Sequence, residues 1–359
     1  MWQLPTAPAR AVPAAERAVD RRVGAYLRTR RGWTVTILPY VGHGTPTRVH
    51  VRARVVARSR KVRVRPAAML LAGLGYYLSA AVAGEPVTIA LAGLQVQATS
   101  DVEGYVDATV ETPGLAPGWH SVVFRLGTAE VVPGRVLVVD PEARVGVVSD
   151  IDDTIIHTGL TRLVEAIRTA LLVAEEQRLP IGGASELYAG LVAGDQGRAP
   201  VFYVSTGAWN LHSVLERFLA RHAFPPGPML MADWGPGGTW LFREDGIVFK
   251  SRVVISLMDE HPQLRWVLVG DSGQHDPEAY AAVARARPDR LHAIYIRDVT
   301  PQTPVRSQRV RELAADLSAL GTPMLLVRDS VAAAEHAHSL GLLDAATVGH
   351  VRRVVERSP

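Results

Sequence analysis

The pattern of apolar and polar positions divides the chain into two regions that follow a helical segment in residues 12–31. From Trp33 onward, short runs such as "TVTIL" and "RVHVRARVV" alternate apolar with polar residues and are rich in β-branched side chains, which predicts antiparallel strands. From about Glu142, apolar runs alternate with stretches of helical periodicity, as expected of a mainly parallel sheet covered by helices. The pattern therefore predicts a small, mostly-β domain in residues 1–140 and an α/β domain in residues 141–359.

The first domain is expected to hold helical segments beside its strands. Apolar residues recur with helical spacing in residues 12–31, which predicts an amphipathic helix. The glycine-rich segment "GHGTPT" (residues 42–47) is expected to be a loop between the first two strands, and "DVEG" and "TPGLAPG" are expected to be turns. The predicted strands lie in "TVTILPYV", "RVHVRARVVARSRKVRVR", "EPVTIALAGLQVQAT" and "WHSVVFRLG".

Two segments of this domain have more than one interpretation. The basic run in residues 58–65 is either the solvated face of an edge strand or a ridge that binds phosphate or anionic lipid. The uncharged run in residues 66–84 approaches the ~20 residues of a membrane span, but Gly, Ser and Tyr dilute it and strand-like sequence follows at once. A helix packed on the sheet or between the domains is favoured there over a spanning or membrane-surface segment. The first domain is thus a candidate adaptor for a membrane or a partner.

The second domain is expected to alternate strands with helices. Its predicted strands are "RVGVVSD", "PVFYVST", "RWVLVGDS" and "LHAIYIRD". Its predicted helices are "TRLVEAIRTALLVAEEQ", "WNLHSVLERFLARH", "KSRVVISLMDEHP" and "DPEAYAAVARARP". The segment "TPMLLVRDSVAAAEHAHSLGLL" adds one more strand and helix.

Polar side chains stand at the ends of the first three strands of the second domain. These are Asp150 with Asp152, Ser205 with Thr206, and Asp271 with Ser272. Open parallel sheets bind their ligands at the carboxyl ends of the strands, so these side chains can converge on one crevice. Clustered carboxylates at such a crevice suit Mg²⁺, whose coordination is usually completed by water and substrate phosphate. The pattern points to phosphoryl chemistry.

The run "DIDDT" (residues 150–154) alone does not decide between a site and a structural turn. Asp and Thr are ordinary helix caps and turn residues. The spacing of a calcium loop is not met, because apolar Ile155 and Ile156 follow the acidic cluster. The combination with Ser205, Lys250 and the later "GDSGQHD" favours an active site.

Composition limits the environment and the partners of the chain. The 39 basic and 35 acidic residues give a net charge of +4, too small to indicate a nucleic-acid partner, and consistent at most with a diffuse attraction to anionic surfaces. Cys is absent, which excludes disulfides and favours a reducing compartment. The first residues lack the basic-then-apolar order of a secretory signal. We expect a cytoplasmic protein, at most peripheral at the inner membrane face.

The motifs of the second domain resemble those of the haloacid dehalogenase superfamily of aspartyl-phosphate phosphohydrolases. The resemblance is carried by "VGVVSDIDDT", "VFYVST", Lys250 in "VFKSRV", and "WVLVGDSGQHD". More specifically, "SDIDDTIIHTGLT", "YVSTGAWNL", "VLVGDSGQHDPEAY" and "AIYIRDVT" are similar to bacterial members of the actin-patch-associated phosphatidate phosphatase family. The resemblance covers residues 144–300 strongly and the first domain weakly. It implies a Rossmann-like parallel sheet with little cap.

The residues and the resemblance together assign catalytic roles. Asp150 would be the nucleophile that forms an aspartyl-phosphate, and Asp152 the acid that protonates the leaving alkoxide and then the base for the hydrolytic water. Lys250 would neutralise the phosphoryl oxygens and the charge of Asp150. Ser205 would donate a hydrogen bond to the phosphoryl group, with Thr206 as the alternative donor.

The remaining candidates hold the metal, shape the loop or contact substrate. Mg²⁺ would be bound by Asp150, Asp271 and the main-chain carbonyl of Asp152. Asp276 would orient Lys250 or a metal-bound water, and Thr154 would fix the loop. Asp153 is interpreted as a turn residue. The candidates for substrate contact are Asn210, His275 and Arg297.

The sequence indicates a substrate class without defining it. About 45 residues separate the first two motifs, too few for a large separate cap, so a bulky or membrane-embedded phosphomonoester could enter. The loop in residues 231–246, with its Gly and Trp residues, is either a mobile wall over a lipid chain or an ordinary surface loop. The resemblance implies phosphatidate or a related lipid phosphate as substrate. The alternatives are a phosphatase for soluble sugar, nucleotide or protein phosphates, and a lipid-surface binding protein with a vestigial site.

Overall fold

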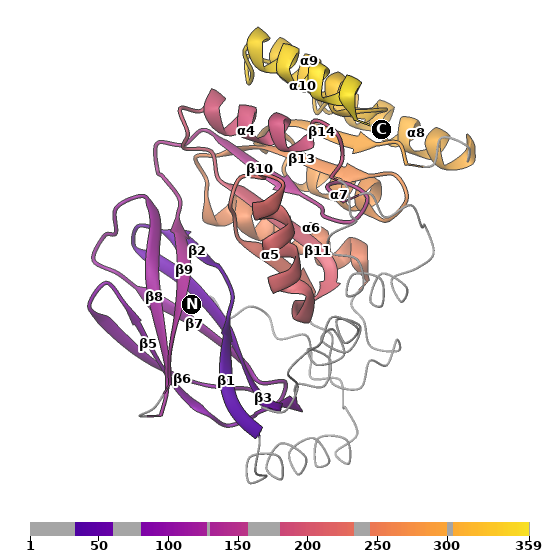
Figure 1. Ribbon diagram of the computed structural model, residues 1–359. Helices are drawn as coiled ribbons and strands as arrows, with labels where there is room; N and C mark the ends of the chain where they lie inside the picture. Colours follow the sequence, from indigo (N-terminus) through magenta and orange to yellow (C-terminus); the bar gives the residue numbers. More distant parts are fainter. Residues whose placement is uncertain are drawn as a thin grey trace.

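The chain forms two sheets that lie side by side in a computed structural model (Figure 1). The structure describes residues 33–59, 80–127, 130–156, 180–232, 245–299 and 304–358. The predicted helices in residues 12–31 and 161–177 lie outside these ranges, as does most of the basic run in residues 58–65 and of the loop in residues 231–246.

The first sheet is mostly antiparallel, and the structure describes nine strands in it. They are β1 (Trp33–Pro39), β2 (Gly42–Thr45), β3 (Arg48–Ser59), β4 (Ala80–Ala81), β5 (Pro86–Leu91), β6 (Leu94–Thr99), β7 (Tyr105–Glu111), β8 (Gly118–Leu126) and β9 (Glu130–Val138). The strand order is β1-β3-β2-β9-β8-β5-β6, with β4 and β7 also paired to β3. Apolar residues from six of these strands, including Val55, Ile89 and Phe124, form its core. The predicted antiparallel β region is confirmed.

The predicted loop at residues 42–47 is wrong, because its first four residues are strand β2. Only Pro46 and Thr47 form the turn between β2 and β3. A Cβ on Gly42 would lie 2.4 Å from the carbonyl oxygen of His50, and one on Gly44 would lie 2.1 Å from that of Arg48. The glycines that suggested a loop are therefore the residues that let β2 and β3 pack this closely.

The apolar segment in residues 66–84 ends in extended structure. Residues 60–79 lie outside the described ranges, but Ala80 and Ala81 form β4, paired with β3. The predicted helix therefore does not extend to residue 84. None of the helices in the described ranges is long and apolar enough to cross a membrane.

The second sheet is parallel throughout the six strands that the structure describes. They are β10 (Val145–Ser149), β11 (Val201–Ala208), β12 (Met229–Ala232), β13 (Arg265–Asp271), β14 (Leu291–Arg297) and β15 (Met324–Val327). Their spatial order, β12-β11-β10-β13-β14-β15, is the doubly wound order 3-2-1-4-5-6. The chain order reverses between β10 and β13, which is where such sheets bind ligands.

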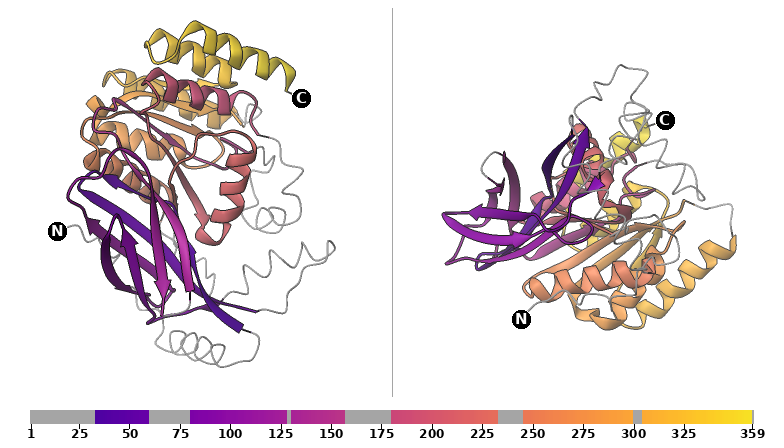
Figure 2. Two further views of the ribbon diagram at one scale, coloured as in Figure 1. Left: turned by 60° about the vertical axis from the view of Figure 1, so that its left-hand side comes forward. Right: turned by 90° about the horizontal axis from the view of Figure 1, so that it is seen from below.

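Helices cover both faces of the parallel sheet. One face packs against α4 (Ala184–Gly194), α5 (His212–Arg221), α9 (Ser330–Ser339) and α10 (Ala345–Arg357). The other face packs against α6 (Gly246–Glu260), α7 (Asp276–Ala286) and α8 (Pro304–Ser318). Figure 2 shows α9 and α10 on the side of the parallel sheet that is remote from the first sheet.

In the parallel sheet and its helices, the predicted pattern of strands and helices is confirmed where the structure describes it, with three helices and one strand added. The added elements are β12, α4, α8 and α10. Helix α6 begins four residues before its predicted start, because the side chain of Asp245 caps it by accepting a hydrogen bond from the backbone N–H of Ile247 at 2.7 Å. The fold is a mixed α/β fold. The haloacid dehalogenase type and the small cap stay predictions.

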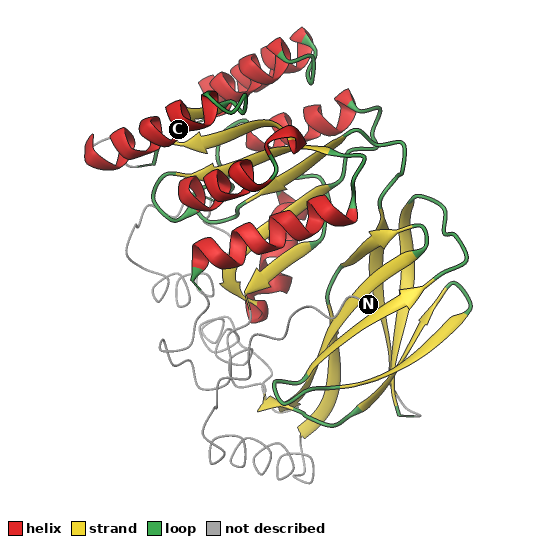
Figure 3. Cartoon of the chain, turned by 180° about the vertical axis from the view of Figure 1, so that it is seen from behind, coloured by secondary structure: helices red, strands yellow, loops and turns green. Residues whose placement is uncertain are grey.

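Side chains connect the two sheets, which form distinct blocks when seen from behind (Figure 3). The rings of Tyr40 and Trp209 have centroids 4.4 Å apart. The guanidinium of Arg52 lies 4.6 Å from the centroid of Trp209, and Arg135 pairs with Glu216 at 2.9 Å. These contacts fix the first sheet beside β11 and α5.

Candidate active site

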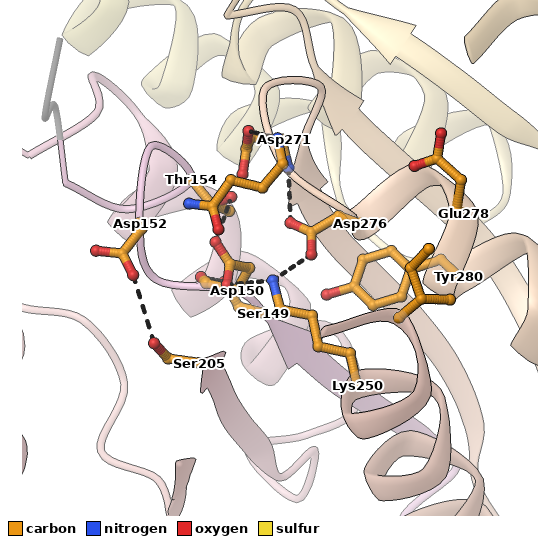
Figure 4. A network of polar contacts seen from close by, with 12 residues as sticks. Ser149, Asp150, Asp152, Thr154, Ser205, Lys250, Asp271, Asp276, Glu278 and Tyr280 are labelled. Carbon is orange, nitrogen blue, oxygen red and sulfur yellow. Dashed lines mark hydrogen bonds and ion pairs between the residues drawn. The ribbon is translucent and has the colours of Figure 1, made fainter. Parts of the chain in front are cut away.

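The predicted carboxylates meet at the point where the strand order reverses (Figure 4). Asp150 follows the last residue of β10, and Asp271 is the last residue of β13. The two strands are direct neighbours, and the backbone N–H of Asp150 donates to the carbonyl of Val269 at 2.9 Å. The parallel register therefore brings together two acidic residues that are 121 positions apart in the sequence.

Lys250 reaches this point from the first turns of α6. Its side chain is only 1% exposed, and its ammonium nitrogen lies 2.7 Å from Oδ1 of Asp150. The same nitrogen donates to Oδ1 of Asp276. Burial alone would lower the pKa of Lys250, but the two carboxylates together raise it above its ordinary value. Lys250 therefore remains charged and acts as a fixed counter-charge.

Asp276 connects Lys250 to the end of β13. It is the first residue of α7 and is fully buried, and its Oδ2 accepts a hydrogen bond from the backbone N–H of Asp271 at 3.0 Å. A Cβ on Gly270 would lie 2.6 Å from that Oδ2 atom, so this approach requires glycine. The segment "GDSGQHD" thus places its second Asp beside its first.

The buried carboxylates are suited to a cation. Ligand atoms of Asp150, Asp271 and Asp276 lie within 4.8 Å of one another. Burial raises the pKa of Asp271 to about 8, aided by Asp276, and burial with the charge of Asp276 also raises that of Asp150, against the opposing effect of Lys250. Oδ2 of Asp271 is buried and has no hydrogen-bond partner among the described residues. A hard divalent cation would supply this oxygen with a partner and offset the excess negative charge.

Asp152 and Ser205 contact each other beside the buried carboxylates. The side chain of Asp152 is half-buried, and the hydroxyl of Ser205 donates to its Oδ2 at 3.4 Å. The backbone N–H of Gly207 donates to the Ser205 hydroxyl at 2.9 Å, and Thr154 donates to Oδ2 of Asp150 at 3.3 Å. The structure therefore brings together the predicted nucleophile, acid, lysine and hydroxyl. Their catalytic roles stay predictions.

The side chain of Arg297 contacts the backbone of the acidic loop. Asp153 has a φ of 54°, a left-handed conformation suited to a tight turn. Arg297, the last residue of β14, donates from Nη1 to the carbonyl of Asp153 at 2.9 Å. In this geometry Arg297 supports the loop from the neighbouring strand end.

The other predicted contacts lie around the same edge of the sheet. Thr206 is buried next to Ser205, and Asn210 belongs to a short 3₁₀ helix, Trp209–Leu211. His275 precedes α7 and is exposed, and its Cδ2 lies 3.1 Å from the point that a Cβ on Gly246 would occupy. His275 therefore lies beside the start of α6.

Two polar side chains behind Asp150 were not predicted from the sequence. Ser149, which is fully buried, donates from its hydroxyl to the carbonyl of Asp150 at 2.6 Å. Since that donation uses its only proton, the hydroxyl of Tyr188 donates to Ser149 at 2.6 Å. Burial raises the pKa of Tyr188 above its ordinary value, so it stays protonated. Tyr188 lies on α4, a helix that the pattern did not reveal.

Arg306 on α8 holds the loop after β13 and was also not predicted. Its Nε donates to the carbonyl of Ser272 at 2.6 Å, and its Nη2 lies 2.9 Å from Oε2 of Glu278 and donates to the carbonyl of Gln274. The guanidinium thus fastens the loop that connects Asp271 to Asp276. No sequence signal distinguishes this Arg from the many others.

The solved structures that resemble the chain do so weakly. A carbohydrate acetylesterase from Xanthomonas citri is 11% identical, with coverage of 90% of this chain and 74% of that chain and a TM-score of 0.31. A cytosolic 5'-nucleotidase IIIB bound to cytidine is 13% identical, with coverage of 50% and 88% and a TM-score of 0.27. Similarity at this level supports neither a shared fold nor a shared function.

The sequence relatives are more informative about the second sheet. The chain is 31% identical over 153 residues to phosphatidate phosphatase APP1 of Saccharomyces cerevisiae, which covers 43% of this chain and 26% of the yeast protein. It is 26% identical over 155 residues to an uncharacterised protein of Schizosaccharomyces pombe, with coverage of 43% and 25%. The chain thus spans about a quarter of the length of the curated relatives it matches. Residues 145–298 match the family model described as phosphatidate phosphatase APP1, catalytic domain, and every predicted site residue lies in that range.

Proposed function

We propose that the chain is a Mg²⁺-dependent phosphomonoesterase that forms an aspartyl-phosphate on Asp150, with phosphatidate or a related lipid phosphate as substrate. One observation carries the proposal. At the reversal point of a doubly wound sheet, Asp150 and Asp276 pair with the buried ammonium of Lys250, and the neighbouring Asp271 keeps one oxygen without a described partner. The match to the phosphatidate phosphatase catalytic domain supports the same assignment.

The residues present fit a magnesium ion. Asp150, Asp271 and the main-chain carbonyl of Asp152 would hold it, since Mg²⁺ prefers oxygen ligands. When bound, it supplies charge stabilisation at the oxygens of the phosphoryl group. The cation would also favour the ionised form of Asp150, which burial disfavours.

The chain's own residues can perform both halves of the reaction. Asp150 attacks phosphorus in line, so that a bond from its carboxylate oxygen to phosphorus forms while the bond to the substrate alkoxide breaks. Asp152 donates its proton to that alkoxide. In the second half, water attacks phosphorus while the bond from phosphorus to the carboxylate oxygen of Asp150 breaks; Asp152 takes the proton of the water, inorganic phosphate leaves and the Asp150 carboxylate is regenerated. Lys250 and Ser205 stabilise the negative charge on the phosphoryl oxygens.

The lipid assignment rests on the sequence relatives. The yeast relative is named a phosphatidate phosphatase, and the family model carries the same description. A lipid substrate would require the protein to work at a membrane surface, for which the first sheet is the candidate adaptor. We therefore propose peripheral contact with anionic membranes from the cytoplasmic side.

The test is a substrate panel with the full chain. Phosphate release is compared for dioctanoyl phosphatidate, glycerol 3-phosphate, a sugar phosphate, a nucleoside monophosphate and a phosphopeptide, each with Mg²⁺ and with excess chelator. We expect Mg²⁺-dependent release, with a kcat/KM for phosphatidate at least about tenfold above that for the soluble phosphates. A tenfold ratio corresponds to a difference of about 1.4 kcal/mol in activation free energy between the two substrates.

Three other outcomes of this panel would each overturn a different part of the proposal. A preference for a soluble phosphate would overturn the lipid assignment and leave the phosphatase in place. Binding to phosphatidate vesicles with no turnover of any substrate would overturn the enzyme and favour a lipid-surface binding protein. Activity unchanged by the chelator would overturn the metal dependence.

A further inference from the structure

A second polar cluster lies at the opposite end of helix α6 from Lys250. It consists of His43 from β2, His50 from β3, Glu260 as the last residue of α6, and His261 directly after it; we call these four residues the histidine cluster. Lys250 and Glu260 are ten residues apart on one helix, which is about 15 Å along its axis. The histidine cluster is therefore separate from the candidate active site.

The two strand histidines are paired by the register of the first sheet. His43 and His50 are direct cross-strand partners in the β2–β3 pair, and their ring centroids are 5.6 Å apart. Directly opposite residues project from the same face of a sheet. Their neighbour Val49 is fully buried in the core of the first sheet, so the two imidazoles project from the other face, toward α6.

The cluster has the composition and the spacing of a metal site. One ligand atom from each of His43, Glu260 and His261 lies within 4.8 Å of the other two. Nδ1 of His43 is 3.5 Å from Oε2 of Glu260, and Nε2 of His50 is 3.1 Å from Oε1 of Glu260. A tetrahedral ion with bonds of 2.0–2.1 Å needs ligand atoms about 3.4 Å apart, a contraction that side-chain rotation can supply.

The burial of His261 is unusual for a polar side chain, because it is not accompanied by hydrogen bonds. Its side chain is 0% exposed, and neither of its ring nitrogens has a hydrogen-bond partner among the residues that the structure describes. Nδ1 of His43 also makes no hydrogen bond within the described ranges, although Oε2 of Glu260 lies 3.5 Å away. A buried polar atom without a partner costs about 1–3 kcal/mol, so these nitrogens need a ligand.

We propose that His43, Glu260 and His261 bind a zinc-class divalent transition metal ion, and that His50 orients the carboxylate of Glu260. Two imidazole nitrogens and one carboxylate oxygen are a donor set that zinc accepts, with the fourth position open to water. Imidazole is a poor ligand for Mg²⁺ and Ca²⁺, so the cluster would discriminate against the cation of the candidate active site. The proposal does not depend on the phosphatase activity.

The surroundings support neutral, oriented ligands. Burial lowers the pKa of His43 and brings that of His261 to about 4, so both imidazoles are neutral near pH 7 and can bind a metal. Phe202 packs edge-on against His43 with ring centroids 5.4 Å apart, and its ring centroid lies 6.0 Å from that of His261. Nδ1 of His50 contacts the hydroxyl of Thr109 at 3.1 Å, which fixes that ring.

The position of the cluster suggests what a bound ion would do. Its ligands come from the first sheet and from α6, so the ion would connect the two parts of the molecule. The side chains of His43 and Glu260 are each 13% exposed, so the cluster lies close to the protein surface. Because α6 also carries Lys250, the ion would anchor the helix that positions the active-site ammonium.

The test measures Zn²⁺ binding directly in the untagged full chain. The protein is treated with a chelator and dialysed, and Zn²⁺ is titrated against a chromophoric competitor in an Asp271→Asn background, which weakens binding at the acidic cluster. We expect one Zn²⁺ ion per chain, bound at least about tenfold more weakly after His261→Gln or His43→Gln. The matched control is His350→Gln, which removes an exposed histidine of α10 and should leave the affinity unchanged.

Two further readouts keep the proposal falsifiable. Co²⁺ should give visible absorption bands that disappear in the His43 variant, and excess Mg²⁺ should not displace it. Zn²⁺ should raise the Tm of the wild-type chain but not that of the His43→Gln variant, whose cooperative unfolding without metal shows that the fold is retained. The proposal is overturned if no Zn²⁺ binds, or if the His43→Gln and His261→Gln variants both bind it as tightly as the control.

Discussion

The two polar clusters at the ends of α6 solve the problem of buried charge in different ways. Around Lys250, carboxylates and an ammonium compensate one another, with contacts of 2.7 Å to Asp150 and a second ion pair to Asp276. In the histidine cluster, one carboxylate faces three imidazoles, and His261 is buried with both ring nitrogens unpartnered among the described residues. The first cluster carries excess negative charge. The second contains neutral imidazoles, those of His43 and His261, with ring nitrogens that make no hydrogen bond among the described residues.

This difference in composition indicates that the two ends of α6 would bind different classes of cation. Crowded carboxylates whose pKa values are raised by burial favour a hard cation with oxygen ligands. Neutral imidazoles beside one carboxylate favour a softer ion such as zinc. The same helix therefore separates two chemically distinct sites, and the following substitutions test that separation.

The largest effect is expected from Asp150→Asn. An amide cannot act as the nucleophile, so kcat/KM for Mg²⁺-dependent phosphate release should fall by at least about 10³-fold, as with other catalytic nucleophiles. Zn²⁺ binding to the histidine cluster should not change. Asp153→Asn is the matched control in the same loop, because Asn tolerates its left-handed φ of 54° and should cost no more than a few-fold. Equal losses in both variants would contradict the assignment of Asp150.

Lys250→Met should produce the largest loss of stability. It leaves Asp150 and Asp276 buried without their shared cation, and removal of one partner from a buried ion pair typically costs about 3–5 kcal/mol. The free energy of unfolding is measured by urea denaturation near neutral pH. Arg285→Met is the control, since its exposed pair with Asp316 is worth less than about 1 kcal/mol. A similar loss in both variants would show that the buried ion pairs of Lys250 contribute no more to stability than an exposed pair does.

Gly44→Ala should weaken the histidine cluster while leaving the acidic one intact. The added Cβ would lie 2.1 Å from the carbonyl oxygen of Arg48, so β2 and β3 must separate, at a cost of about 1–3 kcal/mol. We expect a lower Tm and weaker Zn²⁺ binding, with Mg²⁺-dependent turnover retained. Gly349→Ala in α10, whose Cβ would have its nearest contact at 3.5 Å, should be neutral or slightly stabilising.

The smallest effect is a pH dependence of the Mg²⁺ stabilisation. The pKa of Asp271 is raised to about 8 in the folded state, above its unfolded value near 3.9. Between these values the folded state binds more protons, so the free energy of unfolding without metal falls as pH rises through this range. The increase in Tm caused by Mg²⁺ should therefore grow from about pH 5 to about pH 8. An increase independent of pH, or one retained in full by Asp271→Asn, would argue against metal binding there.

The acidic cluster could be predicted from the sequence because its residues stand in short contiguous motifs at strand ends. Asp150 and Asp271 each follow an apolar run, and parallel strands bring such ends to one edge of the sheet. Tyr188 and Arg306 could not be predicted, since each acts through a backbone carbonyl or a neighbouring hydroxyl rather than through a motif. Their helices also have weak apolar periodicity.

The histidine cluster could not be predicted because it depends on register and on domain placement. "GHGTPT" was interpreted as a loop, yet its first four residues are β2, and only strand pairing sets His43 opposite His50. Glu260 and His261 end a helix more than 200 residues later, where polar residues are ordinary. Apolar patterning reveals which residues lie in strands, but not which face of one sheet will meet another part of the chain.

The central claim, that Asp150 is the nucleophile of a phosphoryl-transfer site, can be tested by trapping the covalent intermediate. Asp152→Asn slows hydrolysis of an aspartyl-phosphate, and an aryl phosphate has a leaving group that needs no protonation, so the intermediate can still form. The variant is mixed with Mg²⁺ and an aryl phosphate that the wild-type chain hydrolyses, quenched in acid and analysed by peptide mass spectrometry. We expect one phosphoryl group on the peptide that contains Asp150, and none when Asp150→Asn is added. No label on that peptide while the wild-type chain releases phosphate, or the same label in the double variant, would contradict it.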